Sequence, residues 1–135
     1  MVLRFFGLFL LLTTLSGCTE PPYNNINNDA LKTMLGQGVP IYDVRRPDEW
    51  QQTGVIKDSQ LLTFVDAGGR MKSDFLDKFT RTVGKDDPVI LICRTGNRTS
   101  SLARYLADNM GYTQIYNVRN GITRWISEGH SVTRL

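Results

Sequence analysis

The sequence predicts one α/β domain with a mainly parallel central sheet and helices on both of its faces. The chain has 135 residues, of which 41% are apolar and 10% aromatic, which suits one packed core and excludes both a multi-domain chain and disorder throughout. Strand-like and helix-like segments alternate along it, as they do in parallel α/β sheets. One segment, 88–92 (PVILI), is apolar throughout, which is typical of a strand buried on both faces.

The predicted strands are short apolar or aromatic runs bounded by Gly, Pro or polar residues, and they cover 41–44, 60–64, 88–92 and 114–118. The predicted helices have apolar residues three and four positions apart; they cover 30–35, 47–53, a segment capped by Ser73, about 99–109, and 122–126. Asn28 or Asp29 is the expected N-cap of the first helix, and Tyr105 is expected to face inward with Leu102 and Leu106.

The N-terminus has the pattern of a secretory signal. A basic residue, Arg4, precedes the apolar run 5–12, which is too short to span a bilayer. Leu15-Ser16-Gly17-Cys18 resembles the bacterial lipobox, in which the cysteine sulfur receives a diacylglyceryl group and becomes the first residue of the mature chain. The expected organisation is a signal peptide over 1–17, a polar lipidated tether without regular structure over 18–28, and the folded domain over 29–135.

Lipidation of Cys18 makes the membrane an expected partner of this chain. A formally possible Cys18–Cys93 disulfide is then ruled out, because the Cys18 sulfur is a thioether. The expected location is the bacterial cell envelope, facing the periplasm. Thr19 follows the cysteine where an aspartate would indicate retention in the inner membrane, which favours the outer membrane.

Charge and composition exclude several classes of function. The net charge of +3 comes from interspersed charges, so a nucleic-acid partner is not expected. The only two cysteines, Cys18 and Cys93, and the only histidine, His130, lack the spacing of metal ligands, and His130 is read as a surface residue. No metal and no cofactor is expected.

The segment from Cys93 to Arg98 carries the strongest chemical signal. It lies between the apolar strand and a helix, where the backbone N–H groups of a tight loop and the helix dipole attract anions. Gly96 and Asn97 are expected to supply the positive φ angles of such a loop. Together with Arg94 and Arg98, these features favour a thiolate at Cys93. A buried structural cysteine is the alternative, but it gives no reason to surround the sulfur with two arginines.

The loop CRTGNRT closely resembles the active-site loop of the rhodaneses, the thiosulfate sulfurtransferases, and the resemblance extends over about residues 26–132. The segment 41–50 (IYDVRRPDEW) is similar to the family's Asp-Val-Arg stretch, and 118–125 (VRNGITRW) to its Gly-Gly-x-x-x-Trp segment. The chain departs from the pattern where Val55, Asp58-Ser59 and Asn120 replace a common His, Gly-Ala and Gly.

The resemblance implies the rhodanese-like fold and covalent catalysis through a Cys93 persulfide. A small anionic donor such as thiosulfate would give a sulfur atom to Cys93, and cyanide or a thiol would accept it. The substrate would be bound by Arg94, Thr95, Gly96, Asn97 and Arg98, with Arg94 as the first candidate for contact with thiosulfate and Arg98 as the second. Asp43 and Arg45 would organise the loop; the alternative for them is a turn-capping aspartate and a surface arginine.

Other functions stay open at this stage. A cysteine-dependent phosphatase or arsenate reductase on the same fold would use Cys-x5-Arg, whereas four residues separate Cys93 from Arg98. A non-enzymatic rhodanese-like binding module is a second alternative, although many such modules lack the cysteine. A thiol-disulfide oxidoreductase is weaker still, since Cys93 has no Cys-x-x-Cys partner.

Overall fold

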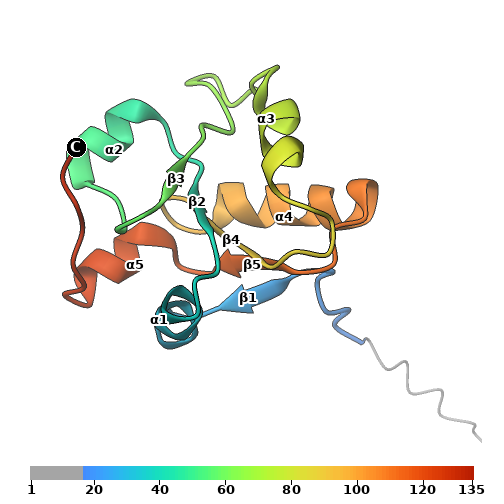
Figure 1. Ribbon diagram of the computed structural model, residues 1–135, viewed down its shortest axis with the longest axis horizontal. Helices are drawn as coiled ribbons and strands as arrows, with labels where there is room; N and C mark the ends of the chain where they lie inside the picture. The colour runs from blue at the N-terminus through green and yellow to red at the C-terminus, as the bar shows by residue number, and fades with distance from the viewer. Residues whose placement is uncertain (1–16) are drawn as a thin grey trace, which may run out of the picture.

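A five-stranded sheet forms the centre of the computed structural model, which describes residues 17–135 (Figure 1). The order of the strands is β1-β5-β4-β2-β3, and every neighbouring pair is parallel. The strands are β1 (Asn24–Ile26), β2 (Ile41–Asp43), β3 (Gln60–Leu61), β4 (Val89–Ile92) and β5 (Ile115–Val118). The predicted α/β class and parallel sheet are confirmed.

Within residues 17–135, five helices lie between or after the strands and cover both faces of the sheet (Figure 1). They are α1 (Asn28–Gly36), α2 (Pro47–Thr53), α3 (Phe75–Thr82), α4 (Asn97–Met110) and α5 (Gly121–Ser127). No helix within residues 17–135 is both long enough and apolar enough to cross a membrane.

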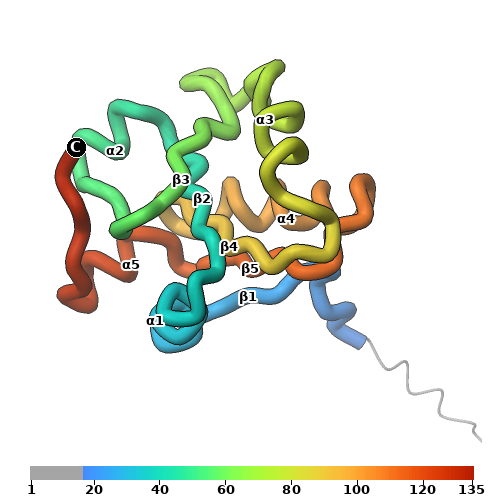
Figure 2. Tube along the Cα trace, in the orientation of Figure 1, coloured from blue at the N-terminus to red at the C-terminus, as the bar shows by residue number. Residues whose placement is uncertain are grey.

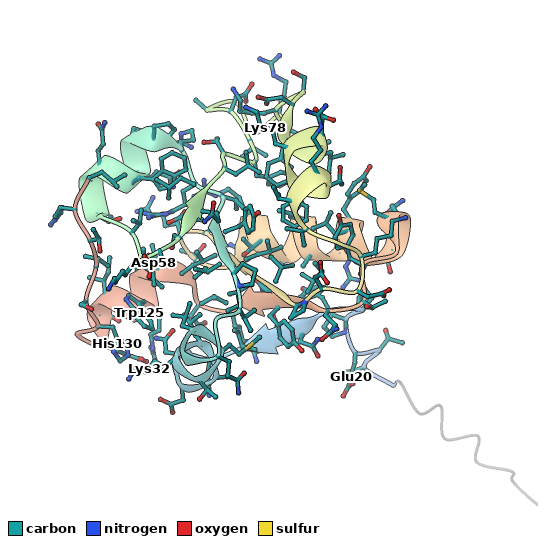
Figure 3. The ribbon with its side chains drawn as sticks, in the orientation of Figure 1. Glu20, Lys32, Asp58, Lys78, Trp125 and His130 are labelled. Carbon is teal, nitrogen blue, oxygen red and sulfur yellow. The ribbon has the colours of Figure 1, made fainter. Side chains whose placement is uncertain are left out.

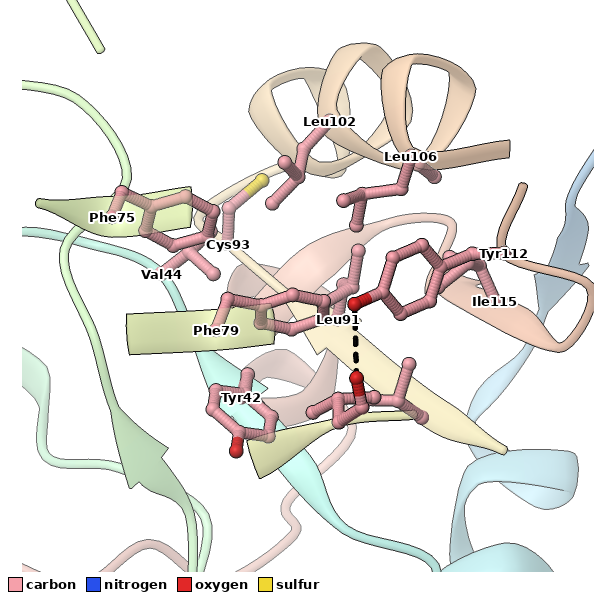
Figure 4. Packing of buried hydrophobic residues seen from close by; sticks show 13 residues of the cluster. Tyr42, Val44, Phe75, Phe79, Leu91, Cys93, Leu102, Leu106, Tyr112 and Ile115 are labelled. Atoms are coloured by element: carbon pink, nitrogen blue, oxygen red, sulfur yellow. Dashed lines mark hydrogen bonds between the residues drawn. The ribbon is translucent and has the colours of Figure 1, made fainter. Parts of the chain in front are cut away.

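The core consists of two apolar clusters, one on each face of the sheet. Alternate residues of β4 point to opposite faces: Val89 and Leu91 pack with residues of α3 and α4, while Ile90 and Ile92 pack with residues of α1 and α5. Figure 4 shows the first cluster, where Phe75 and Phe79 of α3 meet Leu102 and Leu106 of α4 over the sheet. The residues of β4 are all fully buried, as the apolar run predicted.

The register of the sheet brings three loops to the same edge. Asp43 at the end of β2 pairs with Ile92 at the end of β4, and Leu91 of β4 pairs with Asn117 of β5. The loops that follow β2, β4 and β5 therefore lie together at the carboxyl ends of the strands, where parallel sheets bind ligands. Cys93 is the first residue after β4.

Part of the predicted tether is folded, which corrects the expectation for residues 18–28. Asn24–Ile26 forms the edge strand β1 against β5. Ile26 is buried, and burial of this one apolar side chain together with parallel pairing overrides the turn preference of the surrounding asparagines. The predicted signal segment, apart from Gly17, lies outside the described residues.

Several element boundaries also differ from the prediction. The N-cap of α1 is Asn27, whose side chain accepts the N–H of Ala30 at 2.9 Å, and the residue before α3 is Asp74 rather than Ser73. The predicted strand 60–64 ends at Leu61. Beyond it, the backbone still follows β2 irregularly, and Thr63 donates its hydroxyl to the carbonyl of Arg45 at 3.0 Å.

Helix α4 begins at Asn97, two residues before the predicted start, and Tyr105 is exposed rather than inward. Leu102, Ala103 and Leu106 define the buried stripe of α4, and a residue one position before Leu106 is turned by roughly 100° away from that stripe.

The C-terminal segment folds back along α2 (Figure 2). Val55 and Thr133 form an antiparallel bridge with N–H···O distances of 2.9 and 2.7 Å. Figure 3 shows Trp125 and His130 side by side, with ring centroids 4.4 Å apart. His130 is therefore half-buried rather than a surface residue, because its ring packs at a tilt against Trp125 and its Nε2 lies 3.4 Å from a carboxylate oxygen of Glu128.

Candidate active site at the end of strand β4

Cys93 lies beneath the loop between β4 and α4, with its side chain 1% exposed. Its sulfur points toward the start of α4, away from the sheet (Figure 4). The Sγ atom accepts the backbone N–H of Gly96 at 3.2 Å and lies 3.3 Å from the hydroxyl of Thr99. The sulfur thus has two polar partners, which an apolar core position would not supply.

The shape of the loop depends on two glycines in the left-handed region. Gly96 has φ +93°, and a Cβ there would overlap the carbonyl oxygen of Arg119. Gly121 has φ +62°, and a Cβ there would overlap the carbonyl of Arg94. The positive φ predicted for Gly96 is confirmed, whereas the one predicted for Asn97 is wrong, because Asn97 is already the first residue of α4.

The start of α5 holds the carbonyl side of the loop. The N–H of Ile122 donates to the carbonyl of Cys93 at 2.9 Å, and the N–H of Thr123 donates to the carbonyl of Arg94 at 3.1 Å. Because the carbonyls of the loop are bonded to α5, its N–H groups point away from α5.

Those N–H groups are open. Within residues 17–135, the backbone N–H groups of Arg94, Thr95, Asn97 and Arg98 donate to no protein acceptor. They lie at the positive end of the dipole of α4. The loop is therefore a ready anion site directly beside Cys93.

Arg98 is already engaged by another side chain. Its guanidinium forms two hydrogen bonds with the carboxylate of Glu49 on α2, at 2.8 and 2.6 Å. Glu49 also accepts the N–H of Arg46 at 3.0 Å, which caps the start of α2. The hydrogen bond from Arg98 holds the pKa of Glu49 at about 2, well below its usual value.

The pKa of Arg98 is raised, first by its hydrogen bond to Glu49 and then by the negative charges of Glu49 and Asp43. Arg98 therefore links α2 to the loop and contributes positive charge near the sulfur. Glu49 is a part of the site that the sequence prediction missed; its only sequence signal was its place in the acidic segment 47–50.

Arg94 differs from Arg98 in being exposed and in having no side-chain hydrogen bond or ion pair among the described residues. It lines a cavity of about 280 Å³ whose other walls come from α2 and α5. Gln52 and Thr53 are on one side of this cavity, and Thr123 and Ile126 on the other. Of the two predicted arginines, Arg94 is the one whose guanidinium is free to meet a ligand.

Asp43 and Arg45 form a closed, buried ion pair beside the loop. The guanidinium binds both carboxylate oxygens, with distances of 2.9 and 2.7 Å, and Asp43 also accepts the indole N–H of Trp50 at 3.0 Å. Asp43 is 0% and Arg45 1% exposed, so the alternative of a surface arginine is wrong. Arg45 also reaches the carbonyls of Glu49 and Gly54, so the pair fixes α2, whose Glu49 holds Arg98.

Neither Cys93 nor Cys18 forms a disulfide within residues 17–135, and Cys18 is exposed. Within residues 17–135 there is no group of three or more His, Cys, Asp or Glu side chains arranged to hold a metal ion.

The comparisons with known proteins agree on one family. Residues 27–128 match the model of the Rhodanese-like domain. A protein named Sulfurtransferase from Allochromatium vinosum is 31% identical over 108 residues, which is 78% of this chain and 91% of that protein. A Thiosulfate sulfurtransferase GlpE from Tolumonas auensis is 33% identical over 55 residues, and this match spans 41% of the chain and about half (51%) of that relative.

Solved structures share the same fold. A rhodanese-related protein from Thermoplasma volcanium superposes with a TM-score of 0.63 at 28% identity, over 82% of this chain and 98% of that one.

Proposed function

This chain belongs to the rhodanese-like domain family, and we propose that it is a thiosulfate sulfurtransferase that carries sulfur as a persulfide on Cys93. The observation that carries the proposal is the position of the Cys93 sulfur beneath the open N–H groups of the loop 94–98, where it accepts the N–H of Gly96. A nucleophilic sulfur and a bound anion fit this arrangement together.

In the first half of the reaction, the Cys93 thiolate attacks the outer sulfur of thiosulfate. The S–S bond of thiosulfate breaks, its electron pair leaves with sulfite, and a Cys93 persulfide anion remains. The open N–H groups stabilise the negative charge of the incoming donor and of the persulfide. Arg94, at the rim of the loop, attracts the dianionic donor.

In the second half, an acceptor attacks the terminal sulfur of the persulfide. Cyanide leaves as thiocyanate, or a thiolate leaves as a persulfide, and in both cases the electron pair of the broken bond returns to Cys93 as its thiolate. The enzyme then alternates between two stable forms, which predicts ping-pong kinetics. No metal or cofactor takes part in these steps.

Phosphatase or arsenate reductase activity is less well supported. In a Cys-x5-Arg loop, the arginine must be free to clamp a tetrahedral oxyanion, whereas Arg98 is bound by Glu49 through two short hydrogen bonds and follows a loop that is one residue shorter. A non-enzymatic binding module would have no use for the polar partners of the buried Cys93 sulfur.

The test is an assay of thiocyanate formation from thiosulfate and cyanide, with aryl phosphate hydrolysis measured on the same preparation. We expect thiocyanate formation with ping-pong kinetics, and its loss to background in Cys93→Ser without a change in melting temperature. Faster hydrolysis of the aryl phosphate than formation of thiocyanate would favour the phosphatase, and the absence of both activities would favour the binding module.

We also propose that the chain is a lipoprotein of the bacterial cell envelope, anchored through Cys18 and facing the periplasm. Residues 19–23 separate Cys18 from β1, and such a segment reaches at most about 20 Å, so the domain would lie close to the bilayer. Expression of the full chain and of Cys18→Ala in a bacterium tests this. We expect only the unaltered chain to fractionate with membranes, and membrane attachment of Cys18→Ala would contradict the anchor.

A further inference from the structure

Thr99, in the first turn of α4, has a buried hydroxyl between two atoms of the loop. Its side chain is 0% exposed. The Oγ1 atom lies 3.3 Å from the Cys93 sulfur and 3.3 Å from the carbonyl oxygen of Gly96. The proposed sulfur transfer assigns this hydroxyl no role.

A hydroxyl has one proton to donate, so Thr99 can serve only one of these two neighbours at a time. While Cys93 is a thiol, its S–H can donate to Oγ1 and the hydroxyl can donate to the carbonyl of Gly96. When Cys93 is a thiolate it can only accept, and the stronger bond is the one to the charged sulfur. The ionisation state of Cys93 therefore decides where the Thr99 proton points.

Turning toward the sulfur leaves no polar group unpaired. The carbonyl of Gly96 also accepts the backbone N–H of Ser100 at 3.0 Å, so it keeps a donor when the hydroxyl leaves it. The reorientation therefore avoids the cost of an orphaned buried acceptor.

From this geometry we propose that Thr99 is a catalytic hydrogen-bond donor that stabilises the Cys93 sulfur as the leaving group of the second half-reaction. The inference deepens the proposed function and rests on it. When an acceptor attacks the terminal sulfur of the persulfide, the Sγ–S bond breaks and its electron pair goes to Sγ. The hydroxyl of Thr99 and the N–H of Gly96 then both donate to the developing thiolate.

The two half-reactions depend differently on this bond. In the second half, a stabilised leaving sulfur departs faster. In the first half, the same donor increases the thiolate fraction but makes each thiolate a weaker nucleophile, so the two effects oppose each other. Thr99 should therefore affect sulfur release far more than sulfur uptake.

A structural role makes a different prediction. If Thr99 only fills its site and bonds to Gly96, its removal would disturb the loop and slow both halves alike. Valine and serine separate the two roles, because valine keeps the shape of threonine without the hydroxyl and serine keeps the hydroxyl without the methyl group.

The experiment measures both half-reactions in single turnovers of the full chain, Thr99→Val and Thr99→Ser. Persulfide formation from thiosulfate is followed by mass, and release is followed as thiocyanate after cyanide is added to preloaded protein. Loss of a hydrogen bond to a charged group predicts release roughly 10- to 100-fold slower in Thr99→Val, with uptake changed by less than about threefold and both restored in Thr99→Ser. Equal rates in Thr99→Val and the unaltered chain, or equal slowing of both halves, would overturn the proposal.

A second measurement tests Thr99 without sulfur transfer, so a failure of the proposed function is distinguishable. The ultraviolet absorbance of the Cys93 thiolate is followed against pH in the same three proteins, each carrying Cys18→Ala. We expect ionisation at a higher pH in Thr99→Val than in Thr99→Ser and the unaltered protein, because the thiolate loses a donor; identical titrations would overturn the proposal. The charged groups around Cys93 are the same in all three: Arg94 and Arg98 on its loop, Asp43 on β2 and Glu49 on α2.

Discussion

The loops after β2 and β4 lie next to each other at the same edge of the sheet. They differ in whether their charged and polar groups are paired within the protein. After β2, the charges of Asp43 and Arg45 satisfy each other and are completed by Trp50 and backbone carbonyls. After β4, the backbone N–H groups of residues 94–98 point away from the protein's own acceptors, and Arg94 is exposed.

The difference separates stability from chemistry. A buried polar network whose groups are all paired holds the neighbouring helices and strands in place, and it leaves no free donor or acceptor for a ligand. An open set of donors at a helix start contributes little to folding and binds an anion strongly. Changes after β2 should therefore reduce stability first, and changes after β4 should reduce activity first.

Asp43→Asn should have the largest effect, and on stability. It leaves the buried Arg45 charge without its partner, which costs about 3–5 kcal/mol of unfolding free energy. Denaturant unfolding measures this. The matched control is Asp77→Asn, whose ion pair with Arg81 is exposed and is worth at most about 1 kcal/mol. Equal losses in the two variants would contradict the closed-network description.

Gly96→Ala should have the next largest effect, which is a loss of activity. The new Cβ overlaps the carbonyl of Arg119, so the loop must shift, and a displacement near 1 Å lowers rates by roughly 100-fold. Gly129→Ala is the control, since Gly129 also has a positive φ of +81° but nothing within 4 Å of the added Cβ. Comparison of the two variants separates the effect of steric overlap in the active-site loop from the general cost of placing alanine at a positive φ. Full activity of Gly96→Ala would show that the shape of the loop does not matter.

Arg94→Ala should weaken thiosulfate binding without changing stability. Loss of one exposed positive charge near the dianionic donor should raise the KM for thiosulfate about tenfold. Steady-state kinetics with thiosulfate measure the effect, and Arg81→Ala on α3 serves as the control for loss of one surface charge. An unchanged KM would remove Arg94 from the substrate site.

Glu49→Gln should change the acid dependence of stability by a smaller amount. The pKa of Glu49 is lowered from 4.5 to about 2 in the folded protein, so its contribution is fully present above about pH 4.5 and is lost as the pH falls toward about 2. The stability difference between the unaltered chain and Glu49→Gln should therefore shrink over that interval. A constant difference from neutral pH to pH 2 would show that the Arg98–Glu49 pair is not the cause.

The sequence predicted the elements whose patterns are local. The apolar run 88–92 located the central strand, and Gly54 and Gly111 directly follow α2 and α4, where glycine is common in helical proteins. The loop CRTGNRT placed Cys93 before a helix, because strand, tight turn and helix start are contiguous in the chain.

Contacts between distant segments were not predictable in the same way. Glu49 reaches Arg98 across 49 positions, and nothing near either residue encodes that pairing. Strand β1 forms only because β5 offers a free edge, and Arg45 is buried only because Asp43, Thr53 and Gly54 converge on its guanidinium. In the sequence, nothing distinguishes Thr99 from an ordinary helix residue. Only the fold places its hydroxyl beside the Cys93 sulfur.

Whether Cys93 carries sulfur as a persulfide is tested by the mass of the Cys93 peptide after incubation of the protein with thiosulfate. We expect a gain of one sulfur atom on Cys93, and its removal by cyanide with release of an equal amount of thiocyanate. An unmodified Cys93 peptide, or thiocyanate formed without any persulfide on Cys93, would contradict it.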